Sequence, residues 1–133
     1  MNKVLAAWGL DDAELTKLSS GLINQTWRVR SDDGERILQS LNTAIFDPVL
    51  HEDIDAVTAH LAAKGLPTPR LVRTRDDRLW ADIDGECWRL QTVVGNRTIE
   101  RVDDLADAER GGALVARFHR ATADLDYVFQ NPR

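Results

Sequence analysis

The chain has 133 residues, with 17 Lys and Arg against 22 Asp and Glu, so its formal net charge is −5. This length predicts one domain able to bury a core, and 43% hydrophobic with 29% charged residues is typical of a globular protein. No uncharged apolar run is long enough to span a membrane, and an acidic chain without a Lys/Arg block argues against a nucleic-acid partner. The single cysteine, Cys87, cannot form an internal disulfide, which predicts cytoplasmic localisation.

The first third of the chain predicts a short helix and three strands. Residues 2–8 form the expected helix, which Gly9 ends. In the segment 26–30, Trp27 and Val29 alternate with polar residues, as in a half-buried strand. The three predicted strands are residues 15–18, 26–30 and 36–41.

A long helix is predicted over residues 48–64. Asp47 is a good N-cap, Pro48 suits the first helical position, and Gly65 is suited to ending the helix in the left-handed conformation. The apolar stripe of this helix consists of Leu50, Ile54, Val57 and Leu61. The opposite stripe consists of Glu52, Ala56, Ala59 and Ala63. These small residues indicate either close approach of another segment or simply good helix formers.

The rest of the chain predicts further strands and a last helix. Residues 70–74 and 79–83 look like strands around a turn, residues 87–94 form a last strand, and residues 103–125 form a helix. The apolar stripe of that helix consists of Leu114, Phe118, Ala121 and Leu125. We expect an α+β fold, a five-stranded mainly antiparallel sheet with the long helix between strands 3 and 4.

Four stretches of the chain carry a family resemblance. They are Gly21-Leu22-Ile23-Asn24-Gln25-Thr26-Trp27, Ile37-Leu38-Gln39-Ser40-Leu41-Asn42, Trp88-Arg89-Leu90 and Phe118-His119-Arg120. In this order they resemble the aminoglycoside phosphotransferase/choline kinase superfamily, nearest the branch with N-acetylhexosamine 1-kinase-like enzymes. The resemblance implies a protein-kinase-like, nucleotide-binding N-terminal lobe over residues 1–95. It also implies a hinge or linker with the first helix of an absent second lobe over residues 96–133.

The loop between the first two predicted strands has two interpretations. The resemblance implies that Ser20 and Gly21 offer backbone N–H groups to nucleotide phosphates, while Asn24 locks the loop by hydrogen bonds to backbone groups. From composition alone, the same residues are typical of an ordinary hairpin turn.

The resemblance also assigns residues of the third strand, the long helix and the hinge. Gln39 stands where most kinase-type lobes carry a Lys, so either another cation serves the phosphates or nucleotide binding is weak. Glu52 matches the helix Glu and is expected to hydrogen-bond to Gln39, while backbone groups of Thr92 and Val94 are expected to bind adenine. The alternatives are an exposed or edge Gln39 and a Glu52 that only stabilises the helix dipole.

The groups that perform phosphoryl transfer are not found in the sequence. None of His51, His60 and His119 begins the family's His-x-Asp-x-x-x-x-Asn loop, so we expect no catalytic and no metal-binding residue here. The full enzyme would use ATP and Mg²⁺ and phosphorylate a small hydroxyl acceptor, a sugar or aminosugar, bound through the missing lobe. The chain alone is expected to be inert. The alternatives are a stand-alone non-catalytic interaction module, and self-association through the exposed lobe interface.

Overall fold

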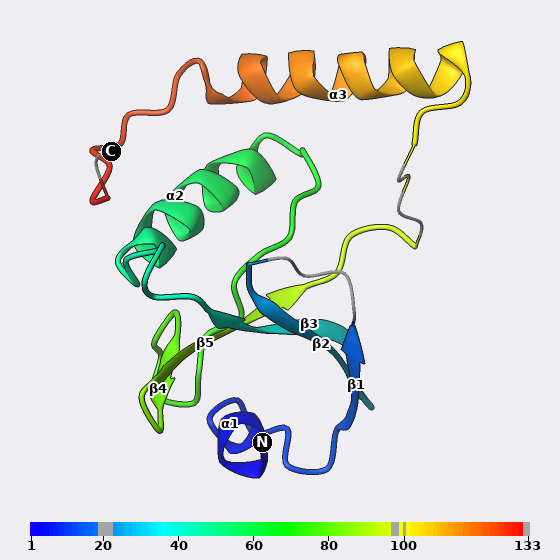
Figure 1. The fold of residues 1–133 in the computed structure, drawn as a ribbon. Helices are drawn as coiled ribbons and strands as arrows, with labels where there is room; N and C mark the ends of the chain where they lie inside the picture. The colour runs from blue at the N-terminus through cyan, green and yellow to red at the C-terminus, as the bar shows by residue number, and fades with distance from the viewer. Residues whose placement is uncertain (19–22, 97–98, 100, 132–133) are drawn as a thin grey trace.

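The computed structural model describes residues 1–18, 23–96, 99 and 101–131. Within these ranges the strands form one antiparallel sheet in the order β1-β2-β3-β5-β4 (Figure 1). The strands are β1 Glu14–Leu18, β2 Gln25–Ser31, β3 Gly34–Leu41, β4 Ala81–Ile83 and β5 Glu86–Thr92. The predicted α+β class and the five-stranded antiparallel sheet are confirmed.

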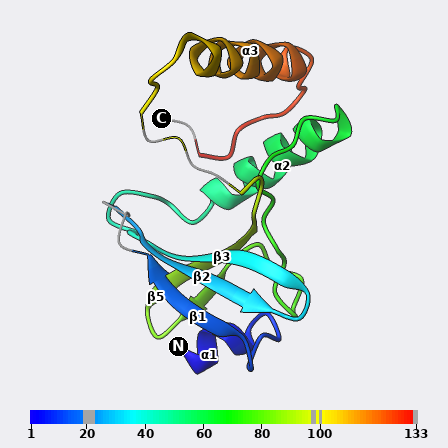
Figure 2. The same cartoon turned by 90° about the vertical axis from the view of Figure 1, so that its right-hand side faces the viewer.

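The helices lie on opposite sides of this sheet. They are α1 Asn2–Ala6, α2 Leu50–Ala63 and α3 Leu105–Thr122. Figures 1 and 2 show α1 on one side of the sheet, with α2 and then α3 on the other. The long helix α2 connects β3 to β4, as predicted, and no helix of the described ranges is both long and apolar enough to cross a membrane.

One face of the sheet builds the hydrophobic core. Strand residues such as Val29, Leu38 and Leu90 are buried there against Val4 and Leu5 of α1. The alternation of side chains along each strand places these residues on the same face. Burying them against the apolar face of α1 removes hydrocarbon from water, which is the main stabilising term of such a fold.

The other face of the sheet is polar at its centre. In the register of β3 with its neighbours, Gln39 lies opposite Thr26 on β2 and opposite Arg89 on β5, and Ile37 lies opposite Gln91. These side chains alternate with the core residues and therefore point away from α1. This face carries the candidate site.

Two expectations about local structure need correction. Residues 70–74 do not form a strand, because within them only Leu71 makes an isolated bridge, to Gln91. Helix α2 begins at Leu50 rather than at residue 48, and the Asp47 carboxylate instead accepts a 2.9 Å hydrogen bond from the Val49 N–H, within a turn that precedes the helix.

The end of α2 follows the expectation. Gly65 has φ +73° and donates its N–H to the Ala62 carbonyl, while Leu66 donates its N–H to the Leu61 carbonyl at 3.0 Å. This is a Schellman motif, in which a left-handed residue satisfies the last carbonyls of a helix. Leu61 and Leu66 are both buried, which adds the apolar contact that usually accompanies this motif.

Of the apolar stripe expected on α2, only Leu61 is buried. Leu50, Ile54 and Val57 line an open groove, and the buried residues of the helix are His51, Asp53 and Leu61. On the opposite stripe, Ala59 and Ala63 are exposed, so no described segment covers their side chains. Helix α3 has no buried residue, and its predicted stripe is open at Leu114 and Phe118.

Candidate functional site

A groove of about 540 Å³ lies between the polar face of the sheet and the segment that follows β5. Gln39, Arg89 and Gln91 line it from the sheet, and Thr92 and Val94 line it from the end of β5 and the following segment. The groove therefore gathers three of the residues that the sequence singled out, namely Gln39, Thr92 and Val94. Apolar surface comes from Leu18, Ile37 and Val93.

Gln39 is the centre of a hydrogen-bond network in this groove. Its Oε1 accepts from Arg89 Nε at 2.9 Å, Arg89 Nη2 at 2.7 Å and Gln91 Nε2 at 3.0 Å. Its Nε2 donates to Thr26 Oγ1 at 3.1 Å. Gln39 is thus half-buried on a central strand, so its interpretation as an exposed or edge residue is wrong. Its partners are strand residues, and the expected hydrogen bond with Glu52 is not among them.

Arg89 brings a positive charge that sequence reasoning treated only as part of a motif. No carboxylate of the described residues forms an ion pair with it. Burial lowers the pKa of its guanidinium, opposed only by the Cys87 thiol. By contrast Arg28, which lines the same groove, has Glu35 at 3.8 Å. The sequence contained this cation within the stretch Trp88-Arg89-Leu90. It did not show that Arg89 lies opposite Gln39, because the fold determines which strands are neighbours.

Thr92 and Val94, the residues expected to bind adenine through their backbone, differ in how many backbone groups they leave for a ligand. The Thr92 N–H donates to the Arg70 carbonyl at 2.9 Å, and Thr92 Oγ1 accepts from the Arg70 N–H at 2.8 Å. The Thr92 N–H is therefore already used. Val94 is 48% exposed, and its backbone makes no hydrogen bond with the described residues. Its N–H and carbonyl are therefore open to a ligand.

The loop before β2 is described only in part. Asn24 Oδ1 accepts a 3.0 Å hydrogen bond from the Asn42 N–H, which ties the loop to the end of β3. This is the kind of side-chain lock on backbone that the sequence suggested. Ser20 and Gly21, the candidate phosphate-binding residues, lie outside the described residues.

Glu52 is exposed and does not line the groove, whereas its neighbour Asp53 is buried. The Asp53 carboxylate accepts hydrogen bonds from Tyr127 Oη at 3.0 Å, the Gln130 N–H at 2.7 Å and the Asn131 N–H at 3.0 Å. Burial opposes ionisation, but these donors outweigh it, so the pKa of Asp53 lies below its ordinary value. Asp53 therefore fixes the C-terminal segment on α2.

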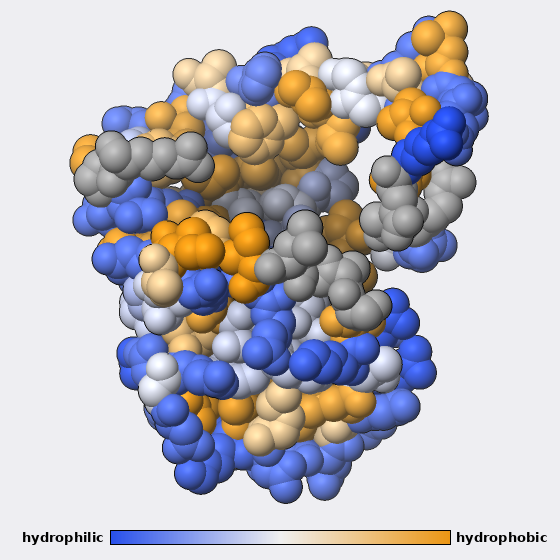
Figure 3. Space-filling view, in the orientation of Figure 1, coloured by the Kyte–Doolittle hydropathy of each residue, from blue (hydrophilic) through white to orange (hydrophobic). Residues whose placement is uncertain are grey.

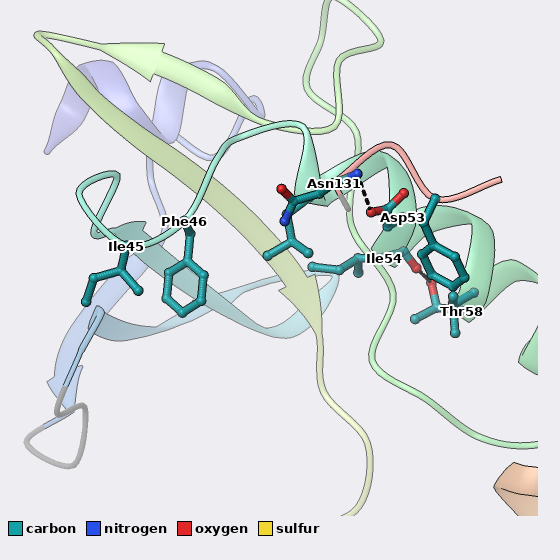
Figure 4. Close-up of a pocket in the computed structure, with 9 residues that line it drawn as sticks. Ile45, Phe46, Asp53, Ile54, Thr58 and Asn131 are labelled. Atoms are coloured by element: carbon teal, nitrogen blue, oxygen red, sulfur yellow. Dashed lines mark hydrogen bonds between the residues drawn. The ribbon is translucent and has the colours of Figure 1, made fainter. Parts of the chain in front are cut away.

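A second groove, of about 600 Å³, opens beside this attachment (Figure 4). Ile45 and Phe46 line it from the segment before α2, Ile54 and Thr58 line it from α2, and Phe129 lines it from the C-terminal segment. Ile45 and Phe129 are more than half exposed. Hydrophobic side chains also gather between the sheet and α3 on the face seen in Figure 3. This groove is mainly apolar, and among the described residues that line it Asp53, whose carboxylate already accepts three hydrogen bonds, is the one acidic side chain.

The described ranges contain no cluster of three or more His, Cys, Asp or Glu side chains placed to hold a metal ion. The polar groove is the candidate binding site. It offers an apolar surface, a free backbone edge at Val94 and a positive charge at Arg89. A ligand with an aromatic base and a neighbouring anionic group fits these three surfaces.

The family profile that matches the chain is that of the phosphotransferase enzyme family, over residues 14–132. The chain belongs to the phosphotransferase enzyme family. The resemblance inferred from the four sequence stretches is thereby confirmed.

Two solved structures of this phosphotransferase type share the fold. An amicoumacin kinase in complex with AMP-PNP, Ca²⁺ and Ami superposes with a TM-score of 0.78 at 16% identity, over 98% of this chain and 40% of that chain. A microcompartment-associated aminopropanol kinase superposes with a TM-score of 0.74 at 20% identity, over 99% of this chain and 42% of that chain. The chain thus spans about two fifths of either kinase, and it is a phosphotransferase-family domain with the fold of small-molecule kinases.

Proposed function

We propose that this chain is the nucleotide-binding lobe of an ATP-dependent small-molecule phosphotransferase. The observation that carries the proposal is the polar groove, which brings Gln39 and Arg89 of the sheet to the open backbone of Val94. One of the two similar kinase structures is described as a complex with AMP-PNP, an ATP analogue, which supports a nucleotide as the ligand.

Each surface of the groove has a part in this function. The adenine lies against the apolar side chains of Ile37 and Val93 and hydrogen-bonds to the Val94 backbone, which requires no particular side chain there. The Gln39 amide, which is fixed by its hydrogen-bond partners, faces the part of the nucleotide next to the adenine. The family resemblance adds further candidates to the same site, namely Glu52, Asn24, Ser20 and Gly21. In this proposal the loop before β2 lies over the phosphates.

The remaining chemistry belongs to a second lobe. Residues 1–95 form the nucleotide-binding lobe and residues 96–133 the hinge or linker and first helix of the next one. That second lobe supplies the catalytic base, the ligands of Mg²⁺ and the site for the acceptor. The acceptor is a small hydroxyl compound, a sugar or aminosugar on the branch resemblance. The chain alone binds nucleotide and transfers no phosphoryl group.

Isothermal titration of the 133-residue chain with Mg·ATP tests the proposal. The variant Val94→Pro deletes the hinge N–H and is expected to weaken binding. Its matched control is Val102→Pro, which places the same residue in an exposed segment outside the groove and helices. Absence of binding by the unaltered chain at millimolar ATP contradicts the proposal. Phosphorylation of a hexosamine by the chain alone contradicts its inert state.

A second candidate, a non-catalytic interaction module, is favoured by one observation. Helix α3 exposes the apolar side chains of Leu114, Val115 and Phe118 and buries none of its residues. Light scattering over a range of protein concentrations tests self-association through this face. A concentration-dependent mass that Phe118→Asp abolishes favours the module. A monomer that binds Mg·ATP favours the nucleotide-binding lobe.

A further inference from the structure

Arg89 is a half-buried cation on a central part of the sheet, in a groove open to solvent. Two of its nitrogens, Nε and Nη2, donate to the neutral Oε1 of Gln39. Its Nη1 makes no hydrogen bond with the described residues. No described Asp or Glu pairs with it, although many other arginines of the chain have such a partner, among them Arg28, Arg30, Arg70, Arg73 and Arg78.

An unpaired charge at this depth has a cost that the protein alone does not offset. Removing a guanidinium from water is unfavourable unless an opposite charge or a full set of acceptors replaces the water. A single amide oxygen that already accepts from Gln91 supplies no negative charge. An anion entering the groove supplies that charge.

The geometry also prepares Arg89 for an anion. Its Nε and Nη2 are held by Gln39 Oε1, which fixes the plane of the guanidinium, and Nη1 has no hydrogen bond to the described residues on a side chain that lines the groove. Gln91 donates to the same oxygen and so fixes Gln39 in turn. Arginine in a fixed orientation suits phosphate oxygens, because its charge and planar donors act together.

We infer that Arg89 binds the phosphates of the nucleotide and supplies the positive charge that Gln39 lacks. This inference rests on the proposed function, because it concerns the same groove. In most kinase-type lobes a Lys on the third strand provides this charge. Here the charge lies one strand further, on β5, and the residue on β3 orients it. Arg89 and Gln39 thus divide between them what one Lys does elsewhere.

The experiment compares four probes that share a base and differ in phosphate: adenosine, AMP, ADP and ATP. Binding to the 133-residue chain is measured by isothermal titration at low salt, with and without Mg²⁺. For the unaltered chain, affinity is expected to rise from adenosine to ATP. For Arg89→Gln, adenosine binding is expected to be unchanged, and ATP binding to weaken by about tenfold to a hundredfold, the usual cost of losing a charged hydrogen-bond donor.

Three further variants separate this role from general electrostatics. Arg89→Lys keeps the charge without the planar donors and is expected to retain part of the increase in affinity from adenosine to ATP. Arg28→Gln removes a charge of the same groove that Glu35 already compensates, and Arg30→Gln removes a paired charge outside the groove. Both are expected to alter ATP affinity by less than Arg89→Gln. Urea unfolding of every variant shows whether it is folded.

A measurement on the unaltered chain keeps the inference testable if Arg89→Gln does not fold. The side-chain N–H resonance of Arg89 is expected to shift with ATP and with inorganic pyrophosphate, and to stay in place with adenosine. Equal loss of adenosine and ATP binding in Arg89→Gln, an equal effect of Arg28→Gln, or an unmoved Arg89 resonance overturns the inference while the nucleotide-binding function stands. No binding of any of the four probes overturns the proposed function and this inference together.

Discussion

The phenolic hydroxyl of Tyr127 donates a 3.0 Å hydrogen bond to Asp53 Oδ1, across 74 positions of the chain. The same carboxylate accepts the N–H groups of Gln130 and Asn131, so one buried side chain of α2 holds a whole segment of backbone. Figure 4 shows the hydrogen bond from Asn131. The segment in turn forms one wall of the apolar groove through Phe129. Asp53 is therefore a structural residue that positions the second groove.

The first prediction concerns this attachment. Asp53→Asn replaces an acceptor by an amide donor that faces N–H groups, so the segment 127–131 is expected to detach. Hydrogen exchange of the Gln130 and Asn131 amides should then speed up. Tyr127→Phe removes one of three donors and should have a smaller effect. Glu52→Gln, on the exposed side of the same helix, is the matched control, and an equal effect there contradicts the assignment.

The same carboxylate makes the attachment sensitive to acid. Since the pKa of Asp53 lies below its ordinary value of about 4, the unfolded chain takes up a proton before the folded chain does. The stabilisation is therefore present above pH 4 and is lost as the pH falls through the folded pKa. Exchange protection of the Gln130 amide should decrease over that range in the unaltered chain.

Cys87 is predicted to be unreactive in the folded chain. Its thiol is buried, which raises its pKa to about 11, and the charge of Asp82 acts in the same direction against the opposing charge of Arg89. At pH 8 only about one thiol in a thousand is then ionised, and the thiolate is the reactive form. A thiol-specific chromogenic disulfide should label the chain in denaturant and not without it. Rapid labelling of the native chain contradicts this prediction.

His51 is predicted to make stability fall below neutral pH. Burial lowers the pKa of His51, and the positive charge of Arg89 acts in the same direction. A hydrogen bond to the Pro48 carbonyl and the negative charge of Asp82 oppose this shift. The His51 Nδ1 lies 2.7 Å from the Pro48 carbonyl, its ring stacks on Trp80 with 5.3 Å between the ring centroids, and its buried Nε2 has no hydrogen-bond partner among the described residues. The neutral ring suits this site, and a proton on Nε2 would be unsatisfied.

The direction of this pH dependence follows from the difference between the pKa of His51 in the folded and in the unfolded chain. The unfolded histidine gains its proton near pH 6.5, before the folded one, so stability is complete above that pH and decreases as the pH falls below it. Urea midpoints followed by Trp fluorescence at pH 7.5, 6.5 and 5.5 test this. The decrease should be smaller in His51→Leu and unchanged in His119→Gln, whose side chain is exposed on α3. Equal slopes in all three proteins contradict it.

Two glycine substitutions are predicted to have opposite signs. Gly65 has φ +73° with open space around it, so Gly65→Ala should lower the free energy of unfolding by about 1 kcal/mol through backbone conformation alone. Gly112 lies within α3, also in open space, so Gly112→Ala should stabilise that helix by about 0.5–1 kcal/mol. Urea unfolding checks the first, and slower amide exchange along α3 checks the second.

The sequence was a sound guide to several features that depend on neighbours along the chain. Trp27 and Val29 alternate on β2 as expected, and Gly65 ends α2 because a left-handed residue is needed there. It was a poor guide to which helix stripe is buried. Leu50, Ile54 and Val57 form a regular stripe, yet they line a groove, because the face that a helix turns inward depends on what packs against it.

The amino-acid sequence by itself determined the order of the helices and of the five strands, the C-terminal end of α2 and membership of the phosphotransferase family. These follow from side-chain periods, turn residues and short motifs, which are local properties. Only the tertiary structure decided that Arg89 lies opposite Gln39, and that Asp53 rather than Glu52 is the buried carboxylate of α2. Both facts depend on the pairing of segments about 50 to 80 residues apart, which packing and burial select and no local pattern encodes.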